Sequence, residues 1–109
     1  MNWFRTAIAL ALAASASWVL AQSQGVSKSE IQIGSIQDLS GPLASFGKPT
    51  RDGMLLRVEQ ANALGGVQGR KIKLVVEDSA YDTKKAVLAA DKLVSSDKVF
   101  AVVGTLGNL

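Results

Sequence analysis

The chain contains neither cysteine nor histidine. Without cysteine it can form no disulfide, and it has no thiol that could carry a lipid after export. The absence of both residue types excludes most zinc and copper sites and every nucleophile–base pair built on Cys or His. An enzyme would have to depend on carboxylates, lysines or hydroxyls, so we predict a non-enzymatic protein without a cofactor or a metal.

Phosphate-binding motifs and a basic patch are missing as well. No G-x-G-x-x-G follows the first predicted strand and no G-K-[ST] is present, which argues against a nucleotide-binding loop. Nucleic-acid binding requires basic residues clustered on one face. The formal net charge of +3 is instead spread along the chain, and Lys84-Lys85 is typical of a solvated helix face. No nucleic-acid partner is therefore expected.

The first 21 residues have the pattern of a secretory signal peptide. Residues 1–5 carry one positive charge, residues 6–20 are uncharged and mostly aliphatic, and Ala21 is the small residue at the cleavage site. The apolar run of roughly 15 residues is short of the ~20 that a membrane-spanning helix needs. We predict general secretion to the periplasm and no stable membrane insertion after cleavage, with an uncleaved anchor or a buried core helix as alternatives.

Residues 22–29 are small and polar and are predicted to form a linker, so that the domain begins at residue 30. Residues 30–39 alternate in hydrophobicity and predict the first strand, and Pro49 suits the first turn of the helix that follows. Gly65-Gly66 ends this helix. The residues expected on its buried face are Met54, Leu55, Val58, Ala61 and Leu64.

The second half repeats this order. Residues 71–77 carry a nearly continuous apolar run, as expected of a strand buried on both faces of a parallel sheet. Asp82 is placed to cap the next helix. Residues 99–103 (V-F-A-V-V) predict a third strand, followed by a loop from Gly104. The core face predicted for the second helix comprises Ala86, Val87, Ala89, Ala90, Leu93 and Val94.

The β-α-β-α-β order predicts an α/β fold, part of a doubly wound parallel sheet. Crossovers between parallel strands are right-handed in nearly all known proteins. With the strand order 2-1-3, the two helices lie on opposite faces of the sheet. Ligands bind outside the carboxyl ends of strands where the chain direction reverses. The loops 38–47 and 104–109 are therefore expected to meet there and to form the binding site.

Three stretches of the sequence together form a specific family signature, although each stretch alone would be a weak one. They read I-G-S-I-Q-D-L-S-G-P at 33–42, N-A-L-G-G-V-Q-G-R-K-I-K-L-V-V-E-D at 62–78 and A-V-V-G at 101–104. The combination resembles the type I periplasmic binding proteins, and most closely their leucine/isoleucine/valine- and amide-binding branch. The resemblance covers about residues 30–107.

Members of this family are two-lobed receptors that close around a small solute and deliver it to an ABC-type permease. The resemblance implies that residues 30–109 are the N-terminal part of the first ligand-binding lobe, incomplete by itself. The implied partners are a small solute, such as a branched-chain amino acid, and an ABC permease complex. A ligand-sensing receptor or regulator is the alternative, although the signal peptide favours transport. The chain alone is expected to fold poorly and to bind no amino acid, because its sheet is half-built.

The resemblance also implies which residues bind the solute. Phe46, in the same loop as Ser40, would lie against it, and Leu106, Gly107 and Asn108 would lie near its polar head group. Backbone N–H groups at a helix start favour an anion such as an α-carboxylate. Several amino-acid-binding members have a Ser/Thr-rich run after the third strand, whereas this chain reads G-N-L. Urea, an amide or an aromatic acid therefore also remain open as solutes.

Purely structural interpretations exist for the same region. Ser40 belongs to a turn in either case, and Phe46 could fill the core instead of facing a solute. For Asp78, a solvated loop is expected in preference to a metal or phospho-acceptor pocket. Asp38 is ambiguous between these roles.

Overall fold

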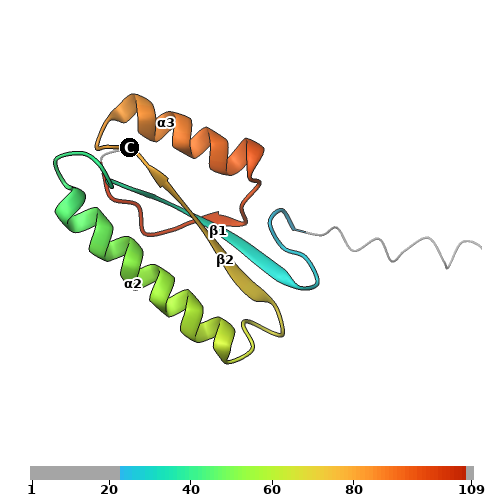
Figure 1. Cartoon of the computed structure of the whole chain (residues 1–109). Helices are drawn as coiled ribbons and strands as arrows, with labels where there is room; N and C mark the ends of the chain where they lie inside the picture. Colours follow the sequence, from blue (N-terminus) through green and yellow to red (C-terminus); the bar gives the residue numbers. More distant parts are fainter. Residues whose placement is uncertain (1–22, 108–109) are drawn as a thin grey trace, which may run out of the picture.

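The computed structural model describes residues 23–107 and has three layers (Figure 1). A parallel sheet of three strands in the order β2-β1-β3 lies between helices. This is the strand order predicted from the sequence. In chain order the elements are β1 (Glu30–Gln37), α2 (Ala44–Ala63), β2 (Lys71–Asp78), α3 (Thr83–Asp91), a π-helical turn η2 (Lys92–Ser96) and β3 (Ala101–Val102).

The central strand is β1, and it pairs with its two neighbours to different extents. Its partner β2 runs beside it over the full eight residues, whereas β3 contributes only Ala101 and Val102. Hydrogen bonds from the N–H groups of Phe100 and Val103 extend the contact of this segment with β1. The predicted strand 99–103 was therefore too long. The extended conformation cannot continue through Gly104, because this residue has a φ of +60°.

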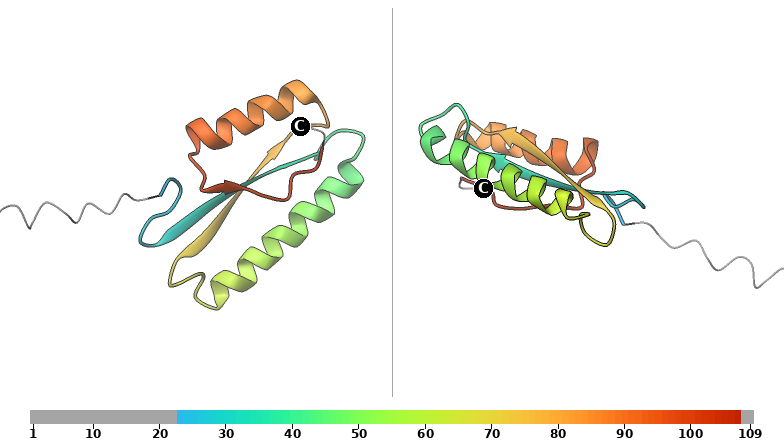
Figure 2. Two further views of the ribbon diagram at one scale, coloured as in Figure 1. Left: turned by 180° about the vertical axis from the view of Figure 1, so that it is seen from behind. Right: turned by 60° about the horizontal axis from the view of Figure 1, so that its bottom comes forward.

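The two helices cover opposite faces of the sheet, as predicted (Figure 2). Successive residues of β1 point to opposite faces. A Cβ atom on Gly34 would lie 2.9 Å from the side chain of Leu93, on the α3 side. The hydroxyl of Ser35 lies 3.8 Å from the sulfur of Met54, on the α2 side.

The buried apolar core lies between β1 and the helical segment α3–η2. It consists of Ile36, Ala89, Leu93 and Val99. The prediction that Val87 and Val94 belong to this core is wrong, because they are 60% and 53% exposed. The helix buries only a narrow stripe at three- and four-residue spacing, and both valines lie beside that stripe.

Helix α2 begins earlier than predicted and buries less. Pro49 lies inside the helix and not in its first turn. The reason is that the carboxylate of Asp38 binds N–H groups of the preceding loop and directs the chain into a helix at Ala44. Leu55 and Leu64 were expected to be buried but are 44% and 87% exposed.

The end of α2 and the start of β2 are joined by side-chain and backbone bonds. Gly65 and Gly66 end the helix with φ of +99° and +75°, as predicted. The amide of Asn62 then pairs with both the N–H and the carbonyl of Ile72 at 2.8 Å. Strand β2 is half-buried and lies at the sheet edge, so the prediction that both its faces are buried is wrong for this chain.

The stretch before β1 lies against the domain. Gln24 donates hydrogen bonds of 3.2 Å to the carbonyls of Val94 and Val99, and Val26 forms a bridge with Ile31. The predicted signal peptide, residues 1–21, lies outside the described residues. Within 23–107, no helix combines the length and the hydrophobicity needed to cross a bilayer.

Candidate functional site

Two loops lie together at the carboxyl end of β1. The first runs from Asp38 into α2, and the second is the segment 103–107 after β3 (Figure 1). The N–H of Leu106 donates to the carbonyl of Ile36 at 2.9 Å, which places the second loop over the end of β1. Within the first loop, Gly47 is packed so closely on Asp38 that a Cβ atom would overlap its carbonyl oxygen. Both loops thus lie at the carboxyl end of β1, as predicted, and their joint contact with a solute stays a prediction.

Asp38 organises the first loop. Its side chain is fully buried, and its carboxylate accepts hydrogen bonds from Gly41 N–H at 2.5 Å and Leu43 N–H at 2.7 Å. These donors occupy both carboxylate oxygens. Asp38 therefore has a structural role in the first loop, because each of its oxygens accepts a backbone hydrogen bond. In the described part of the chain, no group of acidic residues is arranged to hold a metal ion.

Asp78 joins the loops that follow β1 and β2. Its carboxylate accepts hydrogen bonds from Leu39 N–H at 2.9 Å, Ala80 N–H at 2.8 Å and Ser40 Oγ at 2.5 Å. The expectation of a merely solvated loop was therefore incomplete. The partial loss of hydration acts to raise the pKa of the exposed Asp78, but the bonds from Ser40 and the two N–H groups, with the charge of Lys85, outweigh it. The net effect lowers its pKa below the ordinary 3.8.

Asp82 begins α3 as predicted. Its backbone is extended, and its Oδ1 accepts a hydrogen bond of 2.9 Å from Lys85 N–H. This is the side-chain cap expected of an aspartate immediately before a helix.

Sequence reasoning missed two buried polar residues beneath the second loop. Ser35 and Gln37 are both fully buried, on the face of β1 that α2 covers. Gln37 Nε2 donates to Ser35 Oγ at 2.8 Å and to the carbonyl oxygen of Gly104. The signal available in the sequence was their spacing, because two polar residues at i and i+2 share one face of a strand.

The predicted solute-binding residues occupy one end of the sheet, in different environments. The hydroxyl of Ser40 is bonded to Asp78. Phe46 lies in the first turn of α2 and is 65% exposed, so the interpretation that it fills the core is wrong. Leu106 is half-buried and Gly107 is exposed. Asn108 lies outside the described residues. Contact of these residues with a solute stays a prediction.

The family model described as periplasmic binding protein matches residues 30–108. The chain belongs to this family. A Leu/Ile/Val-binding protein homolog from Brucella suis is 42% identical over 79 residues, a match that covers 72% of this chain and 20% of the relative. This periplasmic binding protein chain thus spans about a fifth of the length of the curated relatives it matches.

Two solved structures resemble the chain in both sequence and fold. The branched-chain amino acid transporter substrate-binding protein LivJ from Streptococcus pneumoniae, in complex with isoleucine, is 39% identical with a TM-score of 0.66. The match covers 69% of this chain and 22% of that one. A fatty acid ABC transporter substrate-binding protein from Thermomonospora curvata is 37% identical with a TM-score of 0.67. That match covers 74% of this chain and 20% of the other.

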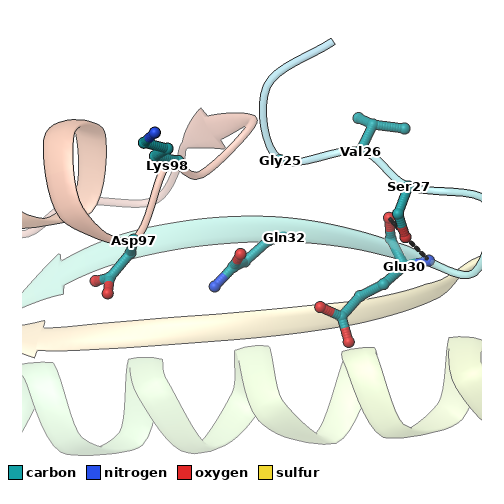
Figure 3. A pocket seen from close by; sticks show the side chains of 7 residues that line it. All are labelled: Gly25, Val26, Ser27, Glu30, Gln32, Asp97 and Lys98. Atoms are coloured by element: carbon teal, nitrogen blue, oxygen red, sulfur yellow. Dashed lines mark hydrogen bonds between the residues drawn. The ribbon is translucent and has the colours of Figure 1, made fainter. Parts of the chain in front are cut away.

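A separate hollow of about 260 Å³ lies at the opposite, amino end of β1. Its lining includes Glu30, Gln32, Asp97 and Lys98 (Figure 3). The ammonium group of Lys98 points away from both carboxylates, and Asp97 is already paired with Lys92 at 2.9 Å. Its polar groups converge on no common point, so the carboxyl end of β1 remains the candidate site.

The bonds to Asp78 predict a pH-dependent contribution to the binding protein's stability. Because its folded-state pKa is lowered, this contribution is present above pH 3.8 and is lost as the pH falls through the folded value. We expect Asp78→Asn to lower the free energy of unfolding at pH 7 by about 1 kcal/mol, a figure that allows for solvent screening. Denaturant unfolding should show this difference shrinking below pH 3.8.

Asp52→Asn is the matched control, because Asp52 is an exposed carboxylate paired only with its neighbour Arg51. We expect it to change stability little at either pH. An equal loss in both variants at pH 7 would contradict the role assigned to Asp78.

Proposed function

We propose that this chain forms part of the first lobe of an extracytoplasmic solute-binding protein. The parent protein would deliver a small solute to an ABC permease. The observation that carries the proposal is the position of the loops 38–47 and 103–107, which both lie at the carboxyl end of β1. Relatives named as transporter substrate-binding proteins support delivery to a permease over a sensory role.

The solute would be a branched-chain amino acid or a related amide or carboxylate. Isoleucine and fatty acids, the compounds in the names of two structural relatives, both combine a carboxylate with an apolar chain. The two loops offer matching surfaces. Phe46 presents an exposed aromatic ring, and the Gly104–Gly107 loop presents exposed backbone that can approach a polar head group. A second lobe would complete the site and exclude water.

Export would precede binding. The signal-peptide pattern of residues 1–21 supports secretion, and membership of the periplasmic binding protein family supports a periplasmic location. The mature protein would bind its solute outside the cytoplasmic membrane and release it to the permease when the two lobes open. No covalent step is involved, so affinity depends on burial and hydrogen bonding alone.

Calorimetric titration of the full-length protein tests this function. The panel comprises L-leucine, L-isoleucine, L-valine, urea, a short-chain amide and benzoate. We expect saturable binding of at least one member, with the apolar carboxylates preferred. Failure of every compound to bind a folded full-length protein would contradict the proposal.

Phe46→Ala is expected to weaken binding of that compound. Burial of an aromatic ring against an apolar solute contributes about 1.5–3 kcal/mol, which corresponds to roughly tenfold to hundredfold in Kd. Phe100→Ala is the matched control. Phe100 is also exposed (56%), but it lies immediately before the amino end of β3, away from the two loops at the carboxyl ends of the strands. An equal loss of affinity in both variants would show that Phe46 does not contact the solute.

A further inference from the structure

The polar pair beneath the second loop differs from the rest of the sheet interior. Ser35 and Gln37 lie on the α2 face of β1 and are 0% exposed. The other face of the same strand carries Gly34 and Ile36, which pack against the apolar side chain of Leu93 and its neighbours. A buried polar pair at this position therefore needs a physical explanation.

Both side chains are directed at one backbone group of the loop. Gln37 Nε2 donates to the carbonyl of Gly104, and Ser35 Oγ lies 3.4 Å from the same oxygen. Backbone bonds of 2.9 Å from Val103 N–H to Gly34 and from Leu106 N–H to Ile36 fix the loop on either side. Gly104, whose backbone has a φ of +60°, is thus held at its own carbonyl as well as through the neighbouring residues Val103 and Leu106.

The arrangement does not maximise stability. Gln37 Oε1 is buried and has no hydrogen-bond partner within the described residues. Such an orphaned acceptor is costly, and an apolar side chain of similar length would avoid the cost. Reversing the amide would place Oε1 against the carbonyl oxygen of Gly104, which cannot donate, so the observed orientation is the one that keeps the bond to Gly104. What glutamine provides here, and an apolar residue would not, is a donor that fixes the loop.

We propose that Gln37 is a positioning residue for solute binding. It touches no solute, and it holds the carbonyl of Gly104 so that the Gly104–Gly107 loop is already in its binding conformation before the solute arrives. Ordering a loop in advance improves affinity because the ordering entropy is not lost on binding. This inference rests on the proposed function, because it assigns that loop to the solute site.

Gln37→Met tests the proposal in the full-length protein, since it removes the donor and the orphaned acceptor together. Without solute, we expect faster amide hydrogen exchange in peptides spanning residues 103–107 and no fall in the unfolding midpoint. The Kd of the panel compound that binds should rise about tenfold. Gln32→Met is the matched control, because Gln32 lies at the amino end of the same strand, and it should change neither exchange nor affinity.

Gln37→Glu adds a readout that a merely structural role would not produce. A carboxylate facing the carbonyl of Gly104 repels it, whereas the protonated acid can donate to it as the amide does. Affinity relative to wild type should be low at neutral pH and recover as the pH is lowered. Unchanged exchange in Gln37→Met, or an affinity in Gln37→Glu that does not recover at low pH, would overturn the proposal. If no panel compound binds the wild type, the proposed function fails, and the exchange measurement still decides the role of Gln37.

Discussion

Replacing Gly47 with alanine is expected to destabilise the protein by about 3 kcal/mol, the upper end of the range for overpacking a buried site. Glycine inside a helix normally costs stability relative to alanine. Here the sign is reversed, because a Cβ atom at Gly47 would overlap the backbone carbonyl of Asp38. Backbone cannot move aside as a flexible side chain can, so either α2 or the loop must shift.

Gly53→Ala in the same helix is the control for this prediction. A Cβ atom there would meet nothing within 4 Å, and the position is exposed. We expect this variant to gain about 0.5–1 kcal/mol from the better helix propensity of alanine. Denaturant unfolding of both variants of the full-length binding protein shows whether each substitution raises or lowers the free energy of unfolding. A gain in both would mean that Gly47 does not pack on Asp38 as described.

Asp38→Ala is expected to cost about 2–3 kcal/mol, because two loop N–H groups lose their acceptor in a partly buried setting. Those donors belong to Gly41 and Leu43, which direct the chain into α2 and so place Phe46. The affinity of the full-length protein for its solute should therefore fall as well. Asp38→Asn keeps one side-chain oxygen and should lie between Asp38→Ala and the wild type in stability.

The control for Asp38 is Asp91→Ala. Asp91 also carries a hydrogen-bonded carboxylate, but that bond is to the hydroxyl of Ser95 on an exposed surface. Denaturant unfolding should show little change for this variant. If it lost as much stability as Asp38→Ala, burial and backbone bonding would not explain the effect.

The topology could be predicted from the sequence because it depends on features that are local or obey a general rule. Apolar runs, helix-ending glycines and the cap at Asp82 mark the elements, and right-handed crossovers then leave few arrangements. The meeting of the two loops follows from strand order alone. This is why the end of the sheet that carries the candidate site could be predicted before any side-chain geometry was known.

The details that failed depend on side-chain contacts that the hydrophobic pattern does not show. Helix α2 begins at Ala44 because the carboxylate of Asp38 accepts a hydrogen bond from Leu43 N–H, and this outweighs the usual preference of proline for the first turn of a helix. The exposure of Val87 and Leu64 reflects which helix faces touch the sheet in this chain. The spacing of Ser35 and Gln37 places both side chains on one face of the strand, but it does not show that this face is buried. The role of Gln37 becomes visible only when the carbonyl of Gly104 is seen to accept its hydrogen bond.

Hydrogen exchange of the full-length protein, with and without the panel compound that binds, tests the central claim most directly. The account predicts slower exchange on binding in peptides covering residues 38–47 and 103–107. Peptides covering 23–27 and 65–70, at the other end of the sheet, should be unchanged. Protection at the amino end with none in the two loops would contradict the account.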